Sequence, residues 1–276
     1  MSKRQIILLV AGALFSITTS ACGMISGLFA TETPVPTNTP LPTSTPTPSP
    51  TVTPVPTVVE AAEEPCTLSP FSSLPTEYQT SDTVTHVDEE AGYELAFSET
   101  WVLVDMVEGD VDEVLATTVE QFPELESTLE TFLNQPGDTG LRLLSLYGDL
   151  DFVFGNIFPN LSVVYIADPL ITLLPIELLT EQTALSMPTL IPEIEVLGTG
   201  FAENAQAVSV GLICSRLDLS GAGHPTFQKQ VIAKGPAGLL VFTFVAADDV
   251  FAEIEPLFDA VIHTFKVIEP ESEDGG

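Results

Sequence analysis

The stretch 226-TFQKQVIAKGPAGLLVFTFVAADDVFAEIEPLFDAVIHTF-265 decides the fold of this chain. Residues 226–234 predict a half-buried strand, and Gly235-Pro236-Ala237-Gly238 predicts a turn, because Gly and Pro supply backbone angles that a strand does not use. The apolar run 239–246 predicts a central strand. Asp248-Asp249 predicts a helix start, after which apolar residues recur at every third or fourth place: Val250, Phe251, Ile254, Leu257, Phe258, Val261, Ile262 and Phe265. A hairpin followed directly by a helix that lies back over it predicts an α/β layer with one core.

The rest of the chain predicts further strands and two more helical segments. A hairpin is expected from strands at 83–89 and 93–97, and other strands are expected at 101–106, 141–147, 161–167, 193–198 and 205–216. A helical stretch is predicted between Asp110 and the stop at 134–137, and a short helix at 175–187. The apolar run 161–180 is not expected to span a membrane, because Asp168, Pro169, Pro175 and Glu177 interrupt it.

Residues 1–22 predict an export signal, with Lys3 and Arg4 before the apolar run 6–17. The run ends at Thr19-Ser20-Ala21-Cys22, which resembles the lipobox of bacterial lipoproteins. That resemblance implies that Cys22 is diacylated and anchors the protein on the extracytoplasmic face of the cell membrane. Two acyl chains are enough for stable anchoring without a basic patch. The alternative is an ordinary cleaved signal in which the cysteine occurs by chance.

Residues 23–58 predict a disordered stalk, and in the span 31–57 Thr or Pro occupies 19 of 27 positions. Proline fixes φ and removes a backbone donor, so this stalk is expected to be an extended chain, about 80 Å long at the polyproline rise. Its composition resembles the linkers of Chloroflexota surface lipoproteins. The globular domain is expected at 59–268, and 269–276 is expected to be an acidic disordered tail.

The formal net charge of −32 excludes one class of partner. Nucleic acids and anionic lipid headgroups both need a basic footprint, which this chain lacks, so no nucleic-acid partner is expected. The negative charge is interpreted as keeping the protein soluble and self-repelling outside the cell. The alternative is that the acidic surface loosely binds divalent cations. The membrane is expected to be contacted through the lipid alone.

The remaining cysteines, Cys66 and Cys214, are candidates for a disulfide in an oxidising compartment, with two buried free thiols as the alternative. His86, His224 and His263 have no metal-site spacing, so no metal and no cofactor are expected. Trp101 is interpreted as a core residue rather than as part of a pocket. No catalytic residue is predicted, and the residues that would bind a ligand remain unknown.

The order of the elements resembles the PsbP-like superfamily, in its bacterial lipoprotein branch of DcrB-type and LpqN-type proteins. The resemblance covers about residues 83–267. It is carried by the Gly-led strand 92–97 before Trp101, by 158-FPNLSVV-164, by the Gly235–Gly238 hairpin, and by a helix ending Ile262-His263-Thr264-Phe265. It implies an α+β fold, an α/β/α sandwich with a central, mostly antiparallel sheet.

The same resemblance implies a non-catalytic role in binding or assembly, with a small-molecule ligand or a surface protein as partner. The alternative is a surface hydrolase whose active site is not contiguous in sequence. Such a site would bring His86 or His224 together with Ser and Asp in a cleft.

Overall fold

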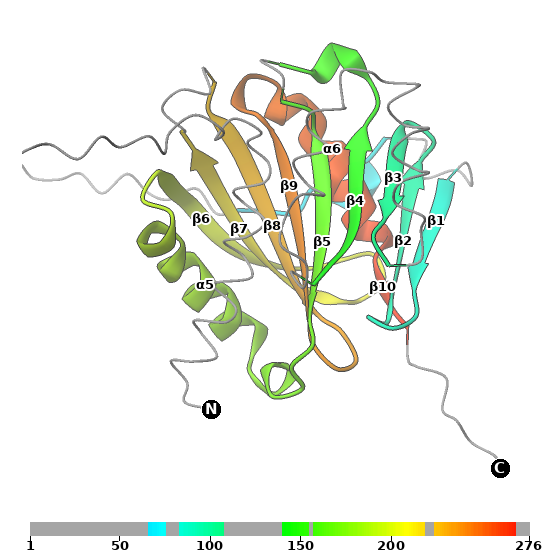
Figure 1. Ribbon diagram of the computed structural model, residues 1–276, viewed down its shortest axis with the longest axis vertical. Helices are drawn as coiled ribbons and strands as arrows, with labels where there is room; N and C mark the ends of the chain where they lie inside the picture. The colour runs from blue at the N-terminus through cyan, green and yellow to red at the C-terminus, as the bar shows by residue number, and fades with distance from the viewer. Residues whose placement is uncertain (1–65, 76–82, 108–139, 155–156, 219–223, 269–276) are drawn as a thin grey trace, which may run out of the picture.

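The computed structural model describes residues 66–75, 83–107, 140–154, 157–218 and 224–268. Its main element is a seven-stranded sheet in which every neighbouring pair of strands is antiparallel. In spatial order the strands are β3 (Trp101–Asp105), β4 (Leu141–Tyr147), β5 (Asn160–Ile166), β9 (Leu239–Ala247), β8 (Thr226–Lys234), β7 (Ser209–Leu217) and β6 (Ile194–Glu203). Figure 1 shows this sheet with α5 (Ile176–Leu190) beside β6 and β7 and with α6 (Asp248–Thr264) behind β5. The predicted α+β class with a mostly antiparallel sheet is confirmed.

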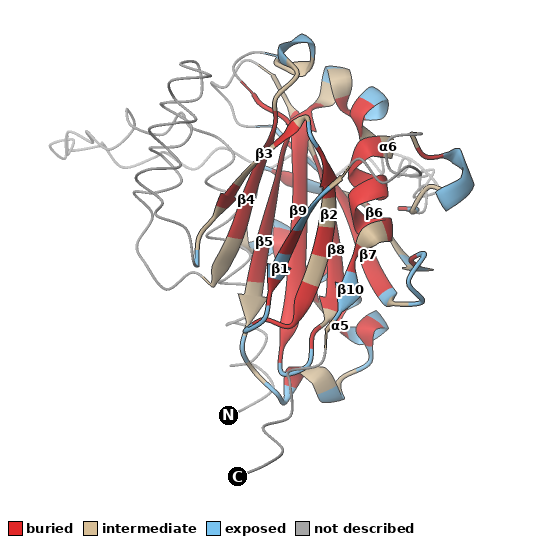
Figure 2. Cartoon of the chain, turned by 90° about the vertical axis from the view of Figure 1, so that its right-hand side faces the viewer, coloured by how far each residue is buried: buried red, intermediate tan, exposed pale blue. Residues whose placement is uncertain are grey.

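The β8–β9 hairpin lies at the centre of the sheet, where the sequence predicts it. Its register pairs Thr226 with Ala247 and Lys234 with Leu239, and the Gly235 N–H donates to the Gly238 carbonyl at 3.0 Å. All nine residues of β9 are buried. Neighbouring residues of β8 pack into different clusters, Val231 into one and Ile232 into another, so both faces of the sheet are covered. Figure 2 shows β8 and β9 buried along most of their length.

α6 covers one face of this sheet with the apolar stripe that its sequence predicts. Phe258 is fully buried and its ring contacts those of Trp101, Phe244 and Phe251. The helix begins at Asp248 with Ala247 as N-cap and without a side-chain capping bond. Asp248 and its neighbour therefore lie in the first turn, where the positive end of the helix dipole favours acids.

A second, three-stranded sheet is the main departure from the expected single sheet. It contains β1 (Thr83–Asp88), β2 (Tyr93–Ser98) and the short β10 (Lys266–Val267), in the order β1-β2-β10. The predicted hairpin is present, but it packs beside α6 instead of joining the large sheet. The Ala96 N–H donates to Thr264 Oγ1 at 2.8 Å, and Leu95 and Phe97 are fully buried in the same core. Apolar alternation identified the strands but could not identify the sheet to which they belong.

α5 packs on the opposite face against β6, β7 and β8. Its apolar side chains, with their partners on the sheet, form a cluster of Ile171, Ile176, Leu179, Ala184, Met187, Ile191, Ile194, Ile213, Leu217, Ile232, Leu239 and Val241. Thr180 lies against Gly211, where a Cβ atom would collide with its hydroxyl, so this close approach requires glycine. Within the ranges described, no helix is both long enough and apolar enough to cross a membrane.

The turn between β6 and β7 differs from the predicted strand boundaries. β6 continues to Glu203 and β7 begins only at Ser209. Asn204 explains the difference: its Oδ1 accepts from the N–H groups of Gln206 and Val208, which holds the chain in a tight turn, and Ala207 has a φ of 60°. The Asn204 amide also donates to two carbonyls at the end of α6, at 2.9 and 2.8 Å. The turn thereby supplies hydrogen-bond donors to carbonyl groups at the C-terminal end of α6.

Four sequence predictions lie outside the described residues. They are the lipobox with Cys22, the stalk at 23–58, the helical stretch that begins at Asp110, and the tail at 269–276. Two short 3-10 turns lie between described elements. η3 (Leu150–Phe152) lies between β4 and β5, and η4 (Ile171–Leu173) lies between β5 and α5. η1 (Phe71–Ser73) follows the first described residues.

Candidate functional site

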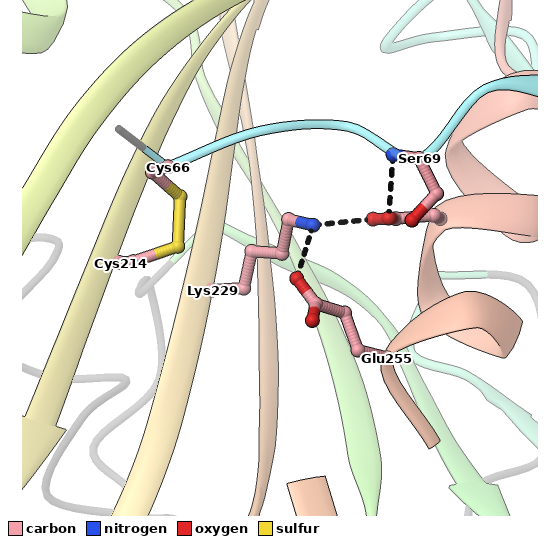
Figure 3. The surroundings of a disulfide bond; sticks show 6 residues. Cys66, Ser69, Cys214, Lys229 and Glu255 are labelled. Carbon is pink, nitrogen blue, oxygen red and sulfur yellow. Dashed lines mark hydrogen bonds and ion pairs between the residues drawn. A yellow bond between two sulfur atoms is a disulfide. The ribbon is translucent and has the colours of Figure 1, made fainter. Parts of the chain in front are cut away.

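A disulfide bonds the first described residues to β7 of the large sheet. Cys66 and Cys214 are bonded, with their Cα atoms 5.5 Å apart, and Cys214 lies on the apolar face of β7 that α6 covers. Figure 3 shows the bridge between the N-terminal segment (residues 66–75) and β7. The carbonyl of Cys66 lies against Gly200 of β6, at a place that no Cβ atom could share. The disulfide that compartment and cysteine count predict is therefore present in the structure.

A buried lysine occupies the core next to this bridge. Lys229 on β8 has an exposed fraction of 0%, and its ammonium lies 2.6 Å from Asp259 Oδ1 and 2.7 Å from Glu255 Oε1. Asp259 is itself only 1% exposed, whereas Glu255 reaches solvent. An unpaired ammonium at this depth would carry a large desolvation cost, so the two carboxylates of α6 are the reason it is tolerated.

The N-terminal segment completes this cluster. The Ser69 N–H donates to Asp259 Oδ2 at 2.8 Å, and Figure 3 shows Ser69 next to the ion pair. His263 Nε2 lies 2.7 Å from the Ser69 carbonyl, while its Nδ1 accepts from the Ala205 N–H at 3.0 Å. His263 lies in the last turn of α6, but both of its hydrogen-bond partners are distant in sequence. Residues 66–69 are thus held at one end by the disulfide and at the other by α6.

This arrangement is structural rather than catalytic. A lysine nucleophile must be neutral and free to reach a substrate, and Lys229 is enclosed between two carboxylates. The segment instead places the start of the domain over its core. Because residues 66–69 are attached to β7 by the disulfide and to α6 by a hydrogen bond, a force applied at the N-terminus would be transmitted to these two elements.

The two other histidines, His86 and His224, each lie beside an aspartate. His86 Nδ1 is 3.5 Å from Asp105 Oδ2, and its Nε2 is 3.2 Å from the Tyr93 hydroxyl. His224 Nδ1 is 3.8 Å from Asp249 Oδ2, and its ring packs edge-on against Phe154. Among the residues that the structure describes, no group of three or more His, Cys, Asp or Glu side chains is arranged to hold a metal.

Arg142 joins the two sheets through a two-pronged contact with Asp88. Its Nε and Nη2 donate to the carboxylate at 2.7 and 2.9 Å. Burial alone raises the pKa of Asp88, but the hydrogen bonds from Arg142 and from the Ala91 N–H outweigh it, so the pKa lies below its ordinary value. Burial also raises the pKa of the Tyr93 hydroxyl. A carboxylate fixed in this way positions β1 against β4 and offers no proton near neutral pH.

The most unusual feature of the molecule is a set of polar side chains inside the sheet, on the face that carries α5. One row crosses three strands as Ser162, Thr243 and Gln230, which are paired in register. The next row contains Asn160, Gln228 and Ser215, with Val245 between the first two. All six polar residues are buried. We call these six side chains the polar rows.

Most of the polar rows have no hydrogen-bond partner among the residues that the structure describes. Both side-chain polar atoms of Gln228 and of Gln230 are unpaired, as are the hydroxyls of Thr243 and Ser215. An unpaired buried polar group costs about 1–3 kcal/mol, so native folds satisfy nearly all of them. Asn160 shows the usual behaviour, since its amide donates to the Phe158 carbonyl at 2.8 Å. Six such atoms on three adjacent strands are unusual for a native fold.

The sequence did not predict this site. The strand at 226–234 was predicted to be half-buried, but β8 is buried on both faces. One signal was available: β8 is the hairpin partner of a strand that is apolar on both sides. A strand paired with a fully buried strand in mid-sheet is itself covered, and its glutamines are then buried as well.

No family model matches the chain, and no curated protein matches it. Among solved structures, the chain is similar to cyanobacterial PsbP (CyanoP) from Synechocystis sp. PCC 6803, at 15% identity and a TM-score of 0.41, covering 68% of this chain and 94% of that one. It is similar to LpqN of Mycobacterium tuberculosis, described as involved in cell envelope biogenesis, at 10% identity and a TM-score of 0.40, covering 64% and 83%.

A third similar structure is a Pseudomonas aeruginosa protein of unknown function, at 11% identity and a TM-score of 0.35, covering 68% of this chain and 98% of that one. These likenesses concern the fold alone.

Proposed function

We propose that this protein is a lipid-anchored extracytoplasmic lipoprotein whose folded domain binds a ligand and catalyses no reaction. The observation that carries the binding role is the unpaired polar rows, which are costly to the fold unless something outside the chain satisfies them. Proteins keep such costly groups where function needs them, and they lose stability in exchange.

The proposed location rests on three features of the N-terminal half. The lipobox-like Thr19-Ser20-Ala21-Cys22 supplies an acylation site, and the Thr/Pro-rich stalk supplies reach. The Cys66–Cys214 disulfide is typical of a protein folded in an oxidising compartment. Because it directly follows the stalk, it also fastens the domain where a membrane anchor would pull.

The hydrolase alternative finds part of its expected site among the described residues, because His86 and His224 each lie beside an aspartate, Asp105 and Asp249. It would need a histidine beside a serine or cysteine nucleophile. His224 instead contacts Asp249 and Phe154, and His263 is held by two backbone groups. Both cysteines of the described domain are consumed by the disulfide.

Cys22→Ala is expected to move the protein from the membrane fraction to the soluble fraction, because the acyl chains are its only proposed contact with lipid. Fractionation followed by immunoblotting measures this. Cys22→Ser serves as a second variant of the same kind, and the far-UV circular dichroism of the released protein should show a folded domain. Retention of both variants in the membrane fraction would contradict lipid anchoring through Cys22.

Gln228→Met and Gln230→Met are each expected to raise the free energy of unfolding of the ligand-free protein by about 1 kcal/mol or more. Methionine has nearly the same length and removes two unpaired polar atoms in each case. Urea unfolding measures the change, and Gln206→Met, at an exposed turn position, is the matched control with an expected change within about 0.5 kcal/mol. Clear destabilisation by both core variants would mean that the glutamines serve the fold and not a ligand.

A further inference from the structure

We propose that Lys229 and Asp259 react with one another to form an intramolecular amide bond, a covalent crosslink between β8 and α6. The crosslink is a modification of the chain itself and does not depend on the proposed ligand binding. Three groups surround the buried lysine: the Asp259 carboxyl group, the Glu255 carboxyl group and the Ser69 N–H beyond them. Each has a separate part in the condensation of an amine with an acid.

The amine and the acid are already in contact. Lys229 Nζ lies 2.6 Å from Asp259 Oδ1. A carboxyl C–O bond is about 1.2 Å long, so the carbon of this carboxyl group lies within about 3.8 Å of the nitrogen. That is close to the separation of about 3–3.5 Å at which fixed, well-oriented groups react. Both side chains are buried and belong to regular elements, β8 and α6, which hold them in this arrangement.

The surroundings of Lys229 favour the loss of its charge. Its in-register neighbours are Cys214 on β7 and Phe244 on β9, and neither carries a charge. Transfer of one proton from the ammonium to a carboxylate turns a costly buried ion pair into a neutral amine and a neutral acid, the two forms that condense. The enclosure that keeps an outside substrate away from Lys229 is no obstacle, because the acid is a side chain of the same core.

Glu255 is placed to move the protons. Its Oε1 lies 2.7 Å from Lys229 Nζ, so it can accept a proton from the attacking nitrogen and return it to the departing Oδ1 of Asp259. A C–N bond forms and one C–O bond breaks. Of the three ammonium protons one stays on the amide, and the other two leave with Oδ1 as water. Glu255 ends as it began, and its 33% exposure connects the site to solvent.

The second oxygen of Asp259 has its own hydrogen-bond donor. The Ser69 N–H donates to Oδ2 at 2.8 Å (Figure 3). Negative charge gathers on this oxygen when the nitrogen attacks the carbon, and a backbone N–H fixed at such a distance stabilises it. The disulfide at Cys66 holds this N–H in place. One carboxylate is enough to neutralise a buried lysine, whereas the second carboxylate and the N–H supply the further groups that amide formation needs.

The amide closes a loop between positions 30 residues apart in the sequence. Such a crosslink stabilises the fold by removing freedom from the unfolded chain, as a disulfide does. The contribution of the ion pair alone to stability is therefore measured against Glu255→Gln, which keeps Lys229 and Asp259 but does not join them.

The test is peptide mass spectrometry of the full-length protein after denaturation, reduction and digestion with trypsin. Trypsin cuts after unmodified Lys and Arg, so a chain without the amide gives three separate peptides, 217–229, 230–234 and 235–266. The amide blocks the cut after Lys229. We expect one branched peptide in which 217–234 is joined to 235–266, with a mass lower than their sum by one water molecule. Its fragment ions should place the branch at Lys229 and Asp259.

Glu255→Gln keeps the size of the side chain but cannot carry the proton, and it is expected to lower the yield of the branched peptide by about tenfold or more. Glu253→Gln, at an exposed position of α6, is the matched control and should give the wild-type yield. Separate peptides from the folded wild type would overturn the proposal, whether or not Glu255→Gln folds. A branch at Glu255, or equal yields from wild type and a folded Glu255→Gln, would overturn it as well.

Discussion

Asp259→Ala is expected to lower the free energy of unfolding by about 3–5 kcal/mol, the usual cost of breaking a buried ion pair by removing one partner. The change leaves the fully buried Lys229 ammonium with Glu255 alone and removes the acceptor of the Ser69 N–H. Urea or thermal unfolding of the purified protein measures the loss. A change below about 1 kcal/mol would mean that the ion pair is not buried as described.

Two further variants separate the charge from the packing. Glu255→Ala should cost clearly less, because Glu255 is 33% exposed and water can replace it. The double variant Lys229→Met with Asp259→Leu should recover most of the loss, because apolar side chains of similar size can replace a buried pair without penalty. Failure of the double variant to recover would point to the Ser69 hydrogen bond as the larger contribution.

Phe258→Ala is expected to cost about 3–5 kcal/mol, the range for truncating a buried phenylalanine. Its ring is fully buried and contacts Trp101, Phe244 and Phe251, so the change opens a cavity where α6 meets the sheet. The same unfolding experiment measures it. Glu253→Ala, on the exposed side of α6, is the matched control and should change stability by less than about 0.5 kcal/mol. Equal effects in the two variants would contradict the packing of the helix.

The sequence predicted the elements of the described chain well, because their signals are local. The spacing of apolar residues along the chain identified the strands of the β8–β9 hairpin and α6. The turn residues at 235–238 located the connection between the two strands. What it missed depends on contacts between distant segments. The assignment of β1 and β2 to a separate sheet is decided by packing against α6, which no local pattern records.

The candidate site was predictable only in part, for the same reason. The disulfide followed from cysteine count and compartment, and not from the spacing of Cys66 and Cys214. Lys229 is one of few basic residues, but its burial follows from two carboxylates on α6 that the fold brings to it. The burial of both faces of β8 was not predicted, because a half-buried strand shows the same sequence pattern whether its polar face meets solvent or is covered by another part of the chain.

The most direct test of an anchored, extracytoplasmic protein is a count of free thiols in the protein taken from the membrane fraction and denatured with an alkylating reagent but without reductant. Peptide mass spectrometry then reports each cysteine separately. We expect no alkylation at any of the three, because Cys22 is acylated and Cys66 is bonded to Cys214. Alkylation of Cys66 and Cys214 would contradict the disulfide and the oxidising compartment, and alkylation of Cys22 would contradict the anchor.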